Sequence, residues 1–227
     1  MNMQNPTRFY LSLFVAVVLA YLTLPVVGQD SAPSADWTLS RLDSVGGHQT
    51  TKLGNPRIVG ASPDQAMEFD GASAIVLDTN PLAELKQFTA EVVFRPVAGG
   101  AKEQRFVHFQ EDGTENRLLF ELRLIDGDRW FLDTFIKSGD GNYTQFADKF
   151  PHPLGPWYHA AVVMDGKTMR HFVNGVEEMA TPVTFAPQKA GKTSIGVRLN
   201  RVSWYSGAVR RVRVTPRVLR PEEFLKP

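Results

Sequence analysis

The sequence contains no cysteine, so its fold must hold without disulfides in any compartment, and a lipid-anchored bacterial lipoprotein is excluded. An excess of charge of either sign is also missing. The 25 Lys and Arg residues against 24 Asp and Glu residues give a formal net charge of +1. This balance argues against a general nucleic-acid binder, whose affinity depends on clustered basic charge.

One long apolar run is present, at the start of the chain. Arg8 precedes an apolar stretch over residues 9–27, and residues 26–28 resemble a small-residue cleavage site. Residues 1–28 therefore predict a signal peptide. An uncleaved N-terminal anchor stays open, since the run approaches the ~20 residues that span a bilayer. We expect residues 29–35 to form a linker and residues 36–227 to form one domain in a secreted or periplasmic, extracytoplasmic protein.

Long helical periodicity is absent, and short alternating segments take its place. From Met67 onward, turn signals recur every ~8–12 residues, which is typical of a β-sandwich. Residues 157–175 predict two strands around Asp165-Gly166, followed by a second turn at Asn174-Gly175, and both dipeptides suit two-residue type I′ turns. We also expect a strand near residues 37–42, followed by a loop up to residue 59. Residues 81–86 and residues 221–225 are each expected to form a single helical turn.

Four segments carry a family resemblance. Residues 157–175, W-Y-H-A-A-V-V-M-D-G-K-T-M-R-H-F-V-N-G, resemble the laminin-G-like domains of the concanavalin A-like lectin/glucanase superfamily. Residues 67–71 (M-E-F-D-G), 88–96 (F-T-A-E-V-V-F-R-P) and 206–224 follow the same family order. The resemblance implies an all-β fold, a concanavalin A-like jelly-roll β-sandwich of two antiparallel sheets. Members of this family are secreted, and many bind glycans.

The same resemblance bears on metals and cofactors. In relatives, an acidic residue of the closing motif can help to hold a structural calcium ion. Here Arg210 and Arg211 stand at the family's acidic pair, and they would repel a cation. Asp70 alone is a poor calcium ligand set, because calcium takes six to eight oxygens. We therefore expect no metal and no cofactor, with a structural calcium ion as the less favoured alternative, and we interpret Asp70-Gly71 as a turn.

Strand alternation predicts one unusually polar face. Leu118, Phe120, Leu122 and Leu124 alternate toward the core, which leaves charged residues on the other side of this segment. Neighbouring segments offer similar positions. The predicted ligand-binding residues are His108, Gln110, Arg117, Glu121, Arg123, Asp133, Lys137, Arg198 and Asn200. The simpler interpretation is a set of solvent faces of half-buried strands.

An ion-pair lattice would make this face a rigid groove floor. We expect Arg117, Glu121 and Arg123 to pair with Asp133 and Lys137. Arginine forks match carboxylates and sulfates in a bidentate manner, so an acidic sugar is the natural ligand.

A second, partial resemblance suggests an enzyme. Residues 120–123 (F-E-L-R) and 135–145 are similar to motifs of jelly-roll alginate lyases. The resemblance implies that Arg123 would neutralise a uronate carboxylate and that His108 would help to remove the C5 proton. Tyr143 would be the acid or base at the glycosidic oxygen. His108 precedes the E-L-R segment, whereas the lyase histidine follows it.

A glycoside hydrolase of this fold needs paired carboxylates on one strand. No such strand occurs, and Glu111-Asp112 and Glu177-Glu178 are predicted to be solvated in turns or hairpins.

The sequence thus favours a non-catalytic module that binds a carbohydrate or an extracellular or cell-surface protein, with no nucleic-acid partner. Membrane contact is expected only through an uncleaved N-terminal segment. A polysaccharide lyase or glycoside hydrolase using the same groove and a structural adhesion module remain the alternatives. A tyrosine within ~3–4 Å of the histidine would favour the enzyme, and a flat polar sheet would favour binding or structure.

Overall fold

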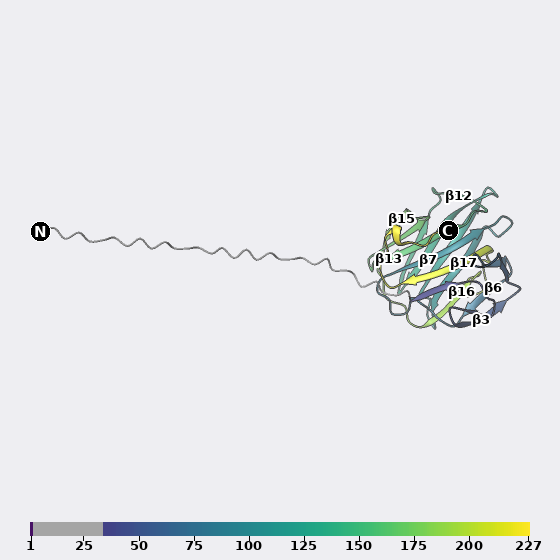
Figure 1. The fold of residues 1–227 in the computed structure, drawn as a ribbon, viewed down its shortest axis with the longest axis horizontal. Coiled ribbons are helices and arrows are strands. Elements are labelled where there is room, and N and C mark those ends of the chain that lie inside the picture. Colours follow the sequence, from purple (N-terminus) through teal and green to yellow (C-terminus); the bar gives the residue numbers. More distant parts are fainter. Residues whose placement is uncertain (2–33) are drawn as a thin grey trace. The chain divides into compact units, whose positions relative to one another are not determined.

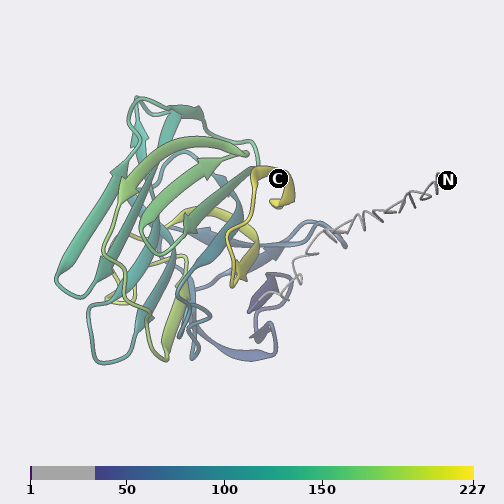
Figure 2. The ribbon, with the colours of Figure 1, turned by 90° about the vertical axis from the view of Figure 1, so that its left-hand side faces the viewer.

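The computed structural model describes Met1 and residues 34–227, and residues 34–227 form two antiparallel β-sheets packed face to face (Figures 1 and 2). The all-β prediction and the two-sheet jelly-roll architecture are confirmed. The predicted targeting segment lies outside the described residues, as does nearly all of the predicted linker. Within residues 34–227, no helix has the length and apolar character needed to cross a membrane.

The first sheet, here called the β7 sheet, has eight strands in the order β15-β14-β13-β7-β17-β5-β4, with β1 also paired to β17. Its strands are β1 (Ala35–Thr38), β4 (Arg57–Val59), β5 (Ala66–Asp70), β7 (Phe88–Pro96), β13 (Tyr158–Met164), β14 (Thr168–Val173), β15 (Val176–Pro182) and β17 (Ser206–Thr215). The last strand of the chain therefore lies in the middle of the sheet, between β5 and β7 (Figure 1).

The second sheet, the β9 sheet, has nine strands in the order β11-β10-β9-β8-β16-β6-β3-β2, with β12 added beside β10. Its strands are β2 (Ser44–Val45), β3 (His48–Leu53), β6 (Ala74–Leu77), β8 (Glu103–Glu111), β9 (Arg117–Ile125), β10 (Arg129–Ser138), β11 (Gly141–Phe146), β12 (His152–Pro153) and β16 (Gly191–Ile195). The segment predicted to be a loop up to residue 59 in fact contributes β2, β3 and β4, and the first strand spans residues 35–38.

Aromatic side chains fill the space between the sheets. Phe94 of β7 stacks on Phe106 of β8 with ring centroids 4.3 Å apart, and Trp130 of β10 meets Phe94 edge-on at 5.2 Å. All three are fully buried. Each contributes on the order of 2–3 kcal/mol of burial, which explains how the domain folds without disulfides.

The two predicted turns behave differently. Asn174 and Gly175 have φ values of 50° and 82°, as a type I′ turn requires, and the Asn174 side chain also accepts a hydrogen bond from the His159 N–H at 2.9 Å. The type I′ prediction for Asp165-Gly166 is wrong. Three residues connect β13 to β14, and Asp165 Oδ1 instead accepts hydrogen bonds from the N–H groups of Lys167 and Thr168.

The C-terminal residues pack on the outside of the β7 sheet. A short 3₁₀ turn, η1 (Pro221–Glu223), matches the single turn predicted at residues 221–225, whereas residues 81–86 form hydrogen-bonded turns without a helix. It delivers Phe224 onto the rings of His159 and Phe172, with centroids 5.3 and 5.2 Å away. This second, smaller apolar cluster covers part of the outer face of the β7 sheet.

Candidate functional site

The outer face of the β9 sheet brings together seven of the nine residues predicted to bind a ligand. Strand pairing places Gln110 of β8 opposite Arg117 of β9, and Arg117 opposite Lys137 of β10. Glu121 lies opposite Asp133 in the same way. The remaining two of the seven are His108 and Arg123, which lie on this face of β8 and β9. The alternation seen in the sequence therefore gives the correct face for these strands.

Arg198 and Asn200 reach this region by another route. We expected them on a strand, but β16 ends at Ile195, and they belong to a loop. The next residue, Gly196, has a φ of 96°, which stops the strand from continuing. The backbone N–H of Leu199 in this loop donates to His108 Nδ1 at 3.0 Å. The loop therefore covers the β8 end of the face.

His108 is a support for this loop. Its side chain is fully buried. Burial, followed by the nearby charges of Arg198, Arg117 and Arg105, lowers the pKa of His108 to about 3. The ring is consequently neutral near pH 7, and its Nδ1 serves as a hydrogen-bond acceptor for the loop.

Half of the face is an ion-pair lattice. Arg123 Nε lies 2.8 Å from Asp133 Oδ2, and Arg105 Nε lies 2.9 Å from Glu121 Oε2. Arg123 also pairs with Glu103 and lies 3.9 Å from Glu121. The expected Arg123–Asp133 contact is present, but the expected contributions of Arg117 and Lys137 are not.

Glu103 and Arg105 were not predicted for this lattice. A register shift between Arg105 and Val107 inserts one extra residue into β8. This β-bulge puts Arg105 on the same face as His108, although simple alternation separates them. No signal in the sequence marks the bulge.

Two carboxylates of the lattice are nearly sealed from water. Side chains of Glu121 and Asp133 are 4% and 1% exposed. Burial outweighs the attraction of Arg105 and raises the pKa of Glu121 to about 7. Burial likewise raises the pKa of Asp133 against the opposing pull of Arg123. These two carboxylates are paired with Arg105 and Arg123, so the lattice offers little unpaired charge to a ligand.

The other half of the face is basic. We call Arg117, Lys137 and Arg198 the basic strip. Arg117 pairs only with the exposed Glu115, at 2.8 Å, and its guanidinium lies over the Phe135 ring at 4.8 Å. Burial, then repulsion from Arg198, lowers the pKa of Arg117. Among the residues that the structure describes, no carboxylate pairs with Lys137 or Arg198.

Aromatic residues on this face escaped the sequence analysis. Phe131 and Phe146 meet edge-on at 4.5 Å, and Arg123 lies over Phe146 at 5.6 Å. Phe146 is 45% exposed. Their positions follow from the same alternation, since Phe131 lies opposite Arg123 and Phe146 lies opposite Asp133. The face therefore offers apolar ring surface next to charge.

The structure does not bring together the residues that a lyase site would need. Tyr143 lies opposite Ile136, an inward-facing residue, and its hydroxyl accepts a hydrogen bond from the Thr184 N–H at 3.0 Å. His108 is on the outer face three strands away, which corresponds to ~14 Å across the sheet. No shared cleft brings the tyrosine to the histidine.

The prediction that Glu178 is solvated is wrong. Its side chain is 2% exposed, and Oε1 lies 2.7 Å from His152 Nε2. Its other oxygen lies 3.6 Å from Nε2 of the buried His171, which contacts Thr134 across the sheets. This carboxylate is thus part of a buried polar network.

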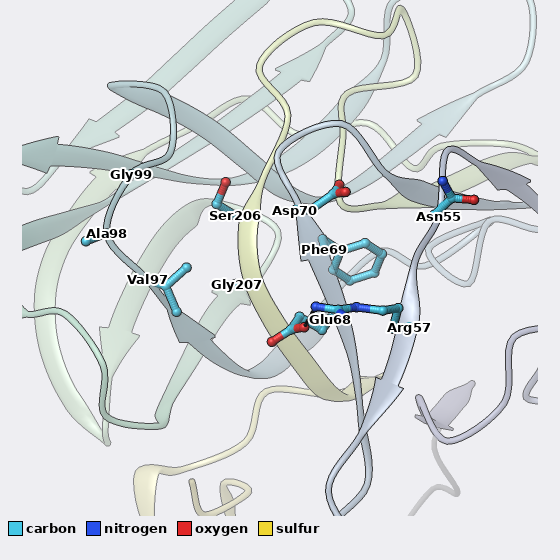
Figure 3. Close-up of a pocket in the computed structure, with 10 residues that line it drawn as sticks. All are labelled: Asn55, Arg57, Glu68, Phe69, Asp70, Val97, Ala98, Gly99, Ser206 and Gly207. Carbon is cyan, nitrogen blue, oxygen red and sulfur yellow. Dashed lines mark hydrogen bonds and ion pairs between the residues drawn. The ribbon is translucent and has the colours of Figure 1, made fainter.

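Two cavities lie at the β4–β5 side of the β7 sheet. The larger, of about 290 Å³, is bordered by β5, the start of β17 and residues 97–99 (Figure 3). Arg57 and Glu68 lie together on its wall, joined by an ion pair of 2.6 Å. Asp70 also lines it, but one of its oxygens accepts from the Ala72 N–H at 3.0 Å and shapes the turn.

The second cavity, of about 250 Å³, contains Trp157 and two arginines, Arg95 and Arg210. Across residues 34–227, no group of three or more His, Asp or Glu side chains is arranged to hold a metal ion. Arg210 and Arg211, which replace the family's acidic pair, make other contacts: Arg210 lies over Trp157, and Arg211 pairs with Asp36.

Comparison with known proteins agrees with this architecture. The family model of the concanavalin A-like lectin/glucanases superfamily matches residues 69–224. The chain belongs to this superfamily. No curated protein sequence matches the chain.

Solved structures show the same concanavalin A-like fold. Domain 4 of AbnA, a GH43 extracellular arabinanase from Geobacillus stearothermophilus solved in complex with arabinotriose, superposes with a TM-score of 0.65. It shares 18% identity over 86% of this chain and 97% of that domain. The binding domain of botulinum neurotoxin serotype D gives 0.60, with 9% identity over 86% of this chain and 50% of that one.

A third structure is the binding domain of botulinum neurotoxin DC in complex with rat synaptotagmin II, with a TM-score of 0.59 and 8% identity. This chain spans about half the length of both neurotoxin domains. At these identities the likeness shows the fold and leaves the ligand open.

Proposed function

We propose that this concanavalin A-like domain is an exported, non-catalytic module that binds an acidic carbohydrate through the outer face of the β9 sheet. The observation that supports it best is the basic strip of Arg117, Lys137 and Arg198. Lys137 and Arg198 lack carboxylate partners among the described residues, and Arg117 has only an exposed one. A uronate or sulfate would relieve the repulsion between these cations and accept forked hydrogen bonds.

Three further features fit this role. The lattice beside the strip is held by buried carboxylates, so the floor is rigid before a ligand arrives. Phe146, which is 45% exposed, adds apolar surface for the face of a sugar ring. The AbnA domain was solved with arabinotriose, so a domain of this fold can carry an oligosaccharide.

The test is a binding assay of the full chain on alginate, pectate, glucuronan and sulfated glycosaminoglycans, with neutral arabinan and dextran alongside. We expect selective binding to acidic glycans, weakened about tenfold in Arg198→Gln because a charge-assisted contact is lost. The matched control is Arg129→Gln, which removes a charge at the opposite end of β10, where Arg129 pairs with Asp126.

Equal binding by both variants, or a preference for neutral glycans, would contradict the basic strip as the site. The same samples are monitored for unsaturated uronate by ultraviolet absorbance. Release of unsaturated uronate would show that the protein is a lyase and not a non-catalytic binding module.

A further inference from the structure

The cavity around Trp157 lies on the opposite sheet from the basic strip. Its defining side chains are Arg95, at the end of β7, Arg210, within β17, and Trp157, just before β13. Arg210 Cζ lies 4.1 Å from the centre of the indole, and Arg95 Cζ lies 5.2 Å from it. The indole of Trp157 thus makes cation–π contacts with two guanidinium groups in one cavity.

Local backbone geometry explains why Arg210 points here. The pairing of β17 with β7 shifts register between Val209 and Arg211, which makes Arg210 the extra residue of a β-bulge. Bulges re-aim a side chain relative to its neighbours. Arg211, the next residue, turns to Asp36 and forms a two-pronged contact with both distances at 2.6 Å.

The two arginines in the cavity are poorly compensated. The nearest carboxylate to Arg210 is Asp64, at 3.7 Å on a side chain that is 74% exposed. Glu68 lies 4.0 Å from Arg95 and is already engaged by Arg57 at 2.6 Å. Moreover, the Nε atoms of Arg95 and Arg210 are both buried without any hydrogen-bond acceptor. A buried donor without an acceptor is costly, so this arrangement calls for an anionic one.

We propose that this cavity is a second ligand site, which binds an oxyanion: a sulfate, phosphate or carboxylate group carried on a small molecule or a sugar. Two oxygens of such a group would accept hydrogen bonds from the two guanidinium forks, as in bidentate carboxylate and phosphate recognition. The cavity, at about 250 Å³, lies just below the ~300 Å³ at which typical ligand pockets begin, so it fits one charged sugar residue or a small oxyanion better than an extended chain.

This inference does not depend on the proposed carbohydrate site. The two sites use different sheets and share no residue, so either can fail alone. Variants of the basic strip should leave the Trp157 cavity unaffected, and the reverse should hold as well.

The experiment follows the side-chain Nε–Hε NMR signals of arginine in the full chain, titrated in separate arms with inorganic sulfate, inorganic phosphate and methyl glucuronide at constant ionic strength. We expect saturable shifts of the Arg95 and Arg210 signals in at least one arm, and the tightest arm identifies the oxyanion. Methyl glucoside, which carries no charge, is the negative control.

Arg210→Gln should weaken that binding about tenfold or more, because one fork is lost. Arg211→Gln is the matched control, since it removes the neighbouring charge outside the cavity and should bind like the parent. If Arg210→Gln is unstable, Arg210→Lys keeps the charge without the fork and should show an intermediate loss. Absence of saturable shifts in all three arms, or equal losses in the position 210 and 211 variants, overturns the proposal.

Discussion

At the scale of the residue, Glu121 shows how much the polar face depends on its own burial. Two guanidinium groups lie within 4 Å of its carboxylate, yet desolvation raises its pKa from 4.5 to about 7. A carboxyl group with a raised pKa in the folded state binds a proton more tightly there than in the unfolded chain. Its contribution to stability is therefore full below pH 4.5 and is lost as the pH rises toward 7.

This sign leads to a prediction for Glu121→Gln. Between pH 5 and pH 7, the parent should lose about 1–3 kcal/mol of unfolding free energy relative to the variant, because a pKa unit corresponds to ~1.4 kcal/mol. Urea unfolding at several pH values measures this difference.

Glu103→Gln is the control for this measurement. Arg123 and Arg105 outweigh the burial of Glu103 and lower its pKa. The parent should therefore lose unfolding free energy relative to Glu103→Gln as the pH falls in the acid range, and not as the pH rises toward 7. A parent that gains stability over Glu121→Gln as the pH rises would show that Arg105 outweighs desolvation.

At the scale of the element, the C-terminal segment (residues 219–225) packs on the outside of the β7 sheet and is hydrogen-bonded to it. The fully buried Glu91 of β7 accepts hydrogen bonds from His159 at 3.1 Å, Arg213 at 2.5 Å and the Leu225 N–H at 2.8 Å. Burial alone would raise the pKa of Glu91, but these hydrogen bonds outweigh it and lower the pKa. Phe224, itself 5% exposed, packs on the ring of His159, which donates to this carboxylate.

Truncating the Phe224 ring tests how much this packing stabilises the domain. Phe224→Ala should reduce the unfolding free energy by about 3 kcal/mol, since it removes a buried aromatic ring from the cluster on the outside of the β7 sheet. Equilibrium urea unfolding gives the value, with the exposed Val218→Ala as the neighbouring control. A loss equal to that of the control would mean that the segment is held by its backbone alone.

The elements also show where the sequence was informative. Alternation in β9 and β10 predicted Arg117, Glu121, Arg123 and Asp133 on one face, because period-two burial follows directly from strand geometry. The bulge in β8 and the end of β16 depend on single backbone dihedrals that alternation does not encode. Arg105 was therefore missed, and Arg198 was assigned to a strand although it lies in a loop.

At the scale of the whole molecule, the first described strand is needed to complete the sheet. Strand β1 pairs with β17, as in Ala35 opposite Val214, and Trp37 is 3% exposed. A chain beginning at Ser31 should retain the thermal stability of the full protein.

A chain beginning at Leu39 lacks β1 and should lose on the order of 3–5 kcal/mol of unfolding free energy with the buried tryptophan. Thermal and urea unfolding of the two truncated chains measures the difference. Equal stability would mean that β1 is an accessory strand.

The position of β17 has a consequence for how the protein is made. Strands β5 and β7, at residues 66–70 and 88–96, flank a place in the sheet that only residues 206–215 can fill. Such pairing over more than a hundred residues gives the topology a high contact order, so folding is slow compared with helical domains. Until residues 206–215 have left the ribosome, β5 and β7 each keep an open edge in the β7 sheet. The nascent domain therefore cannot complete this sheet before residue 215 has been made, and chaperones must protect the open strand edges from aggregation until then.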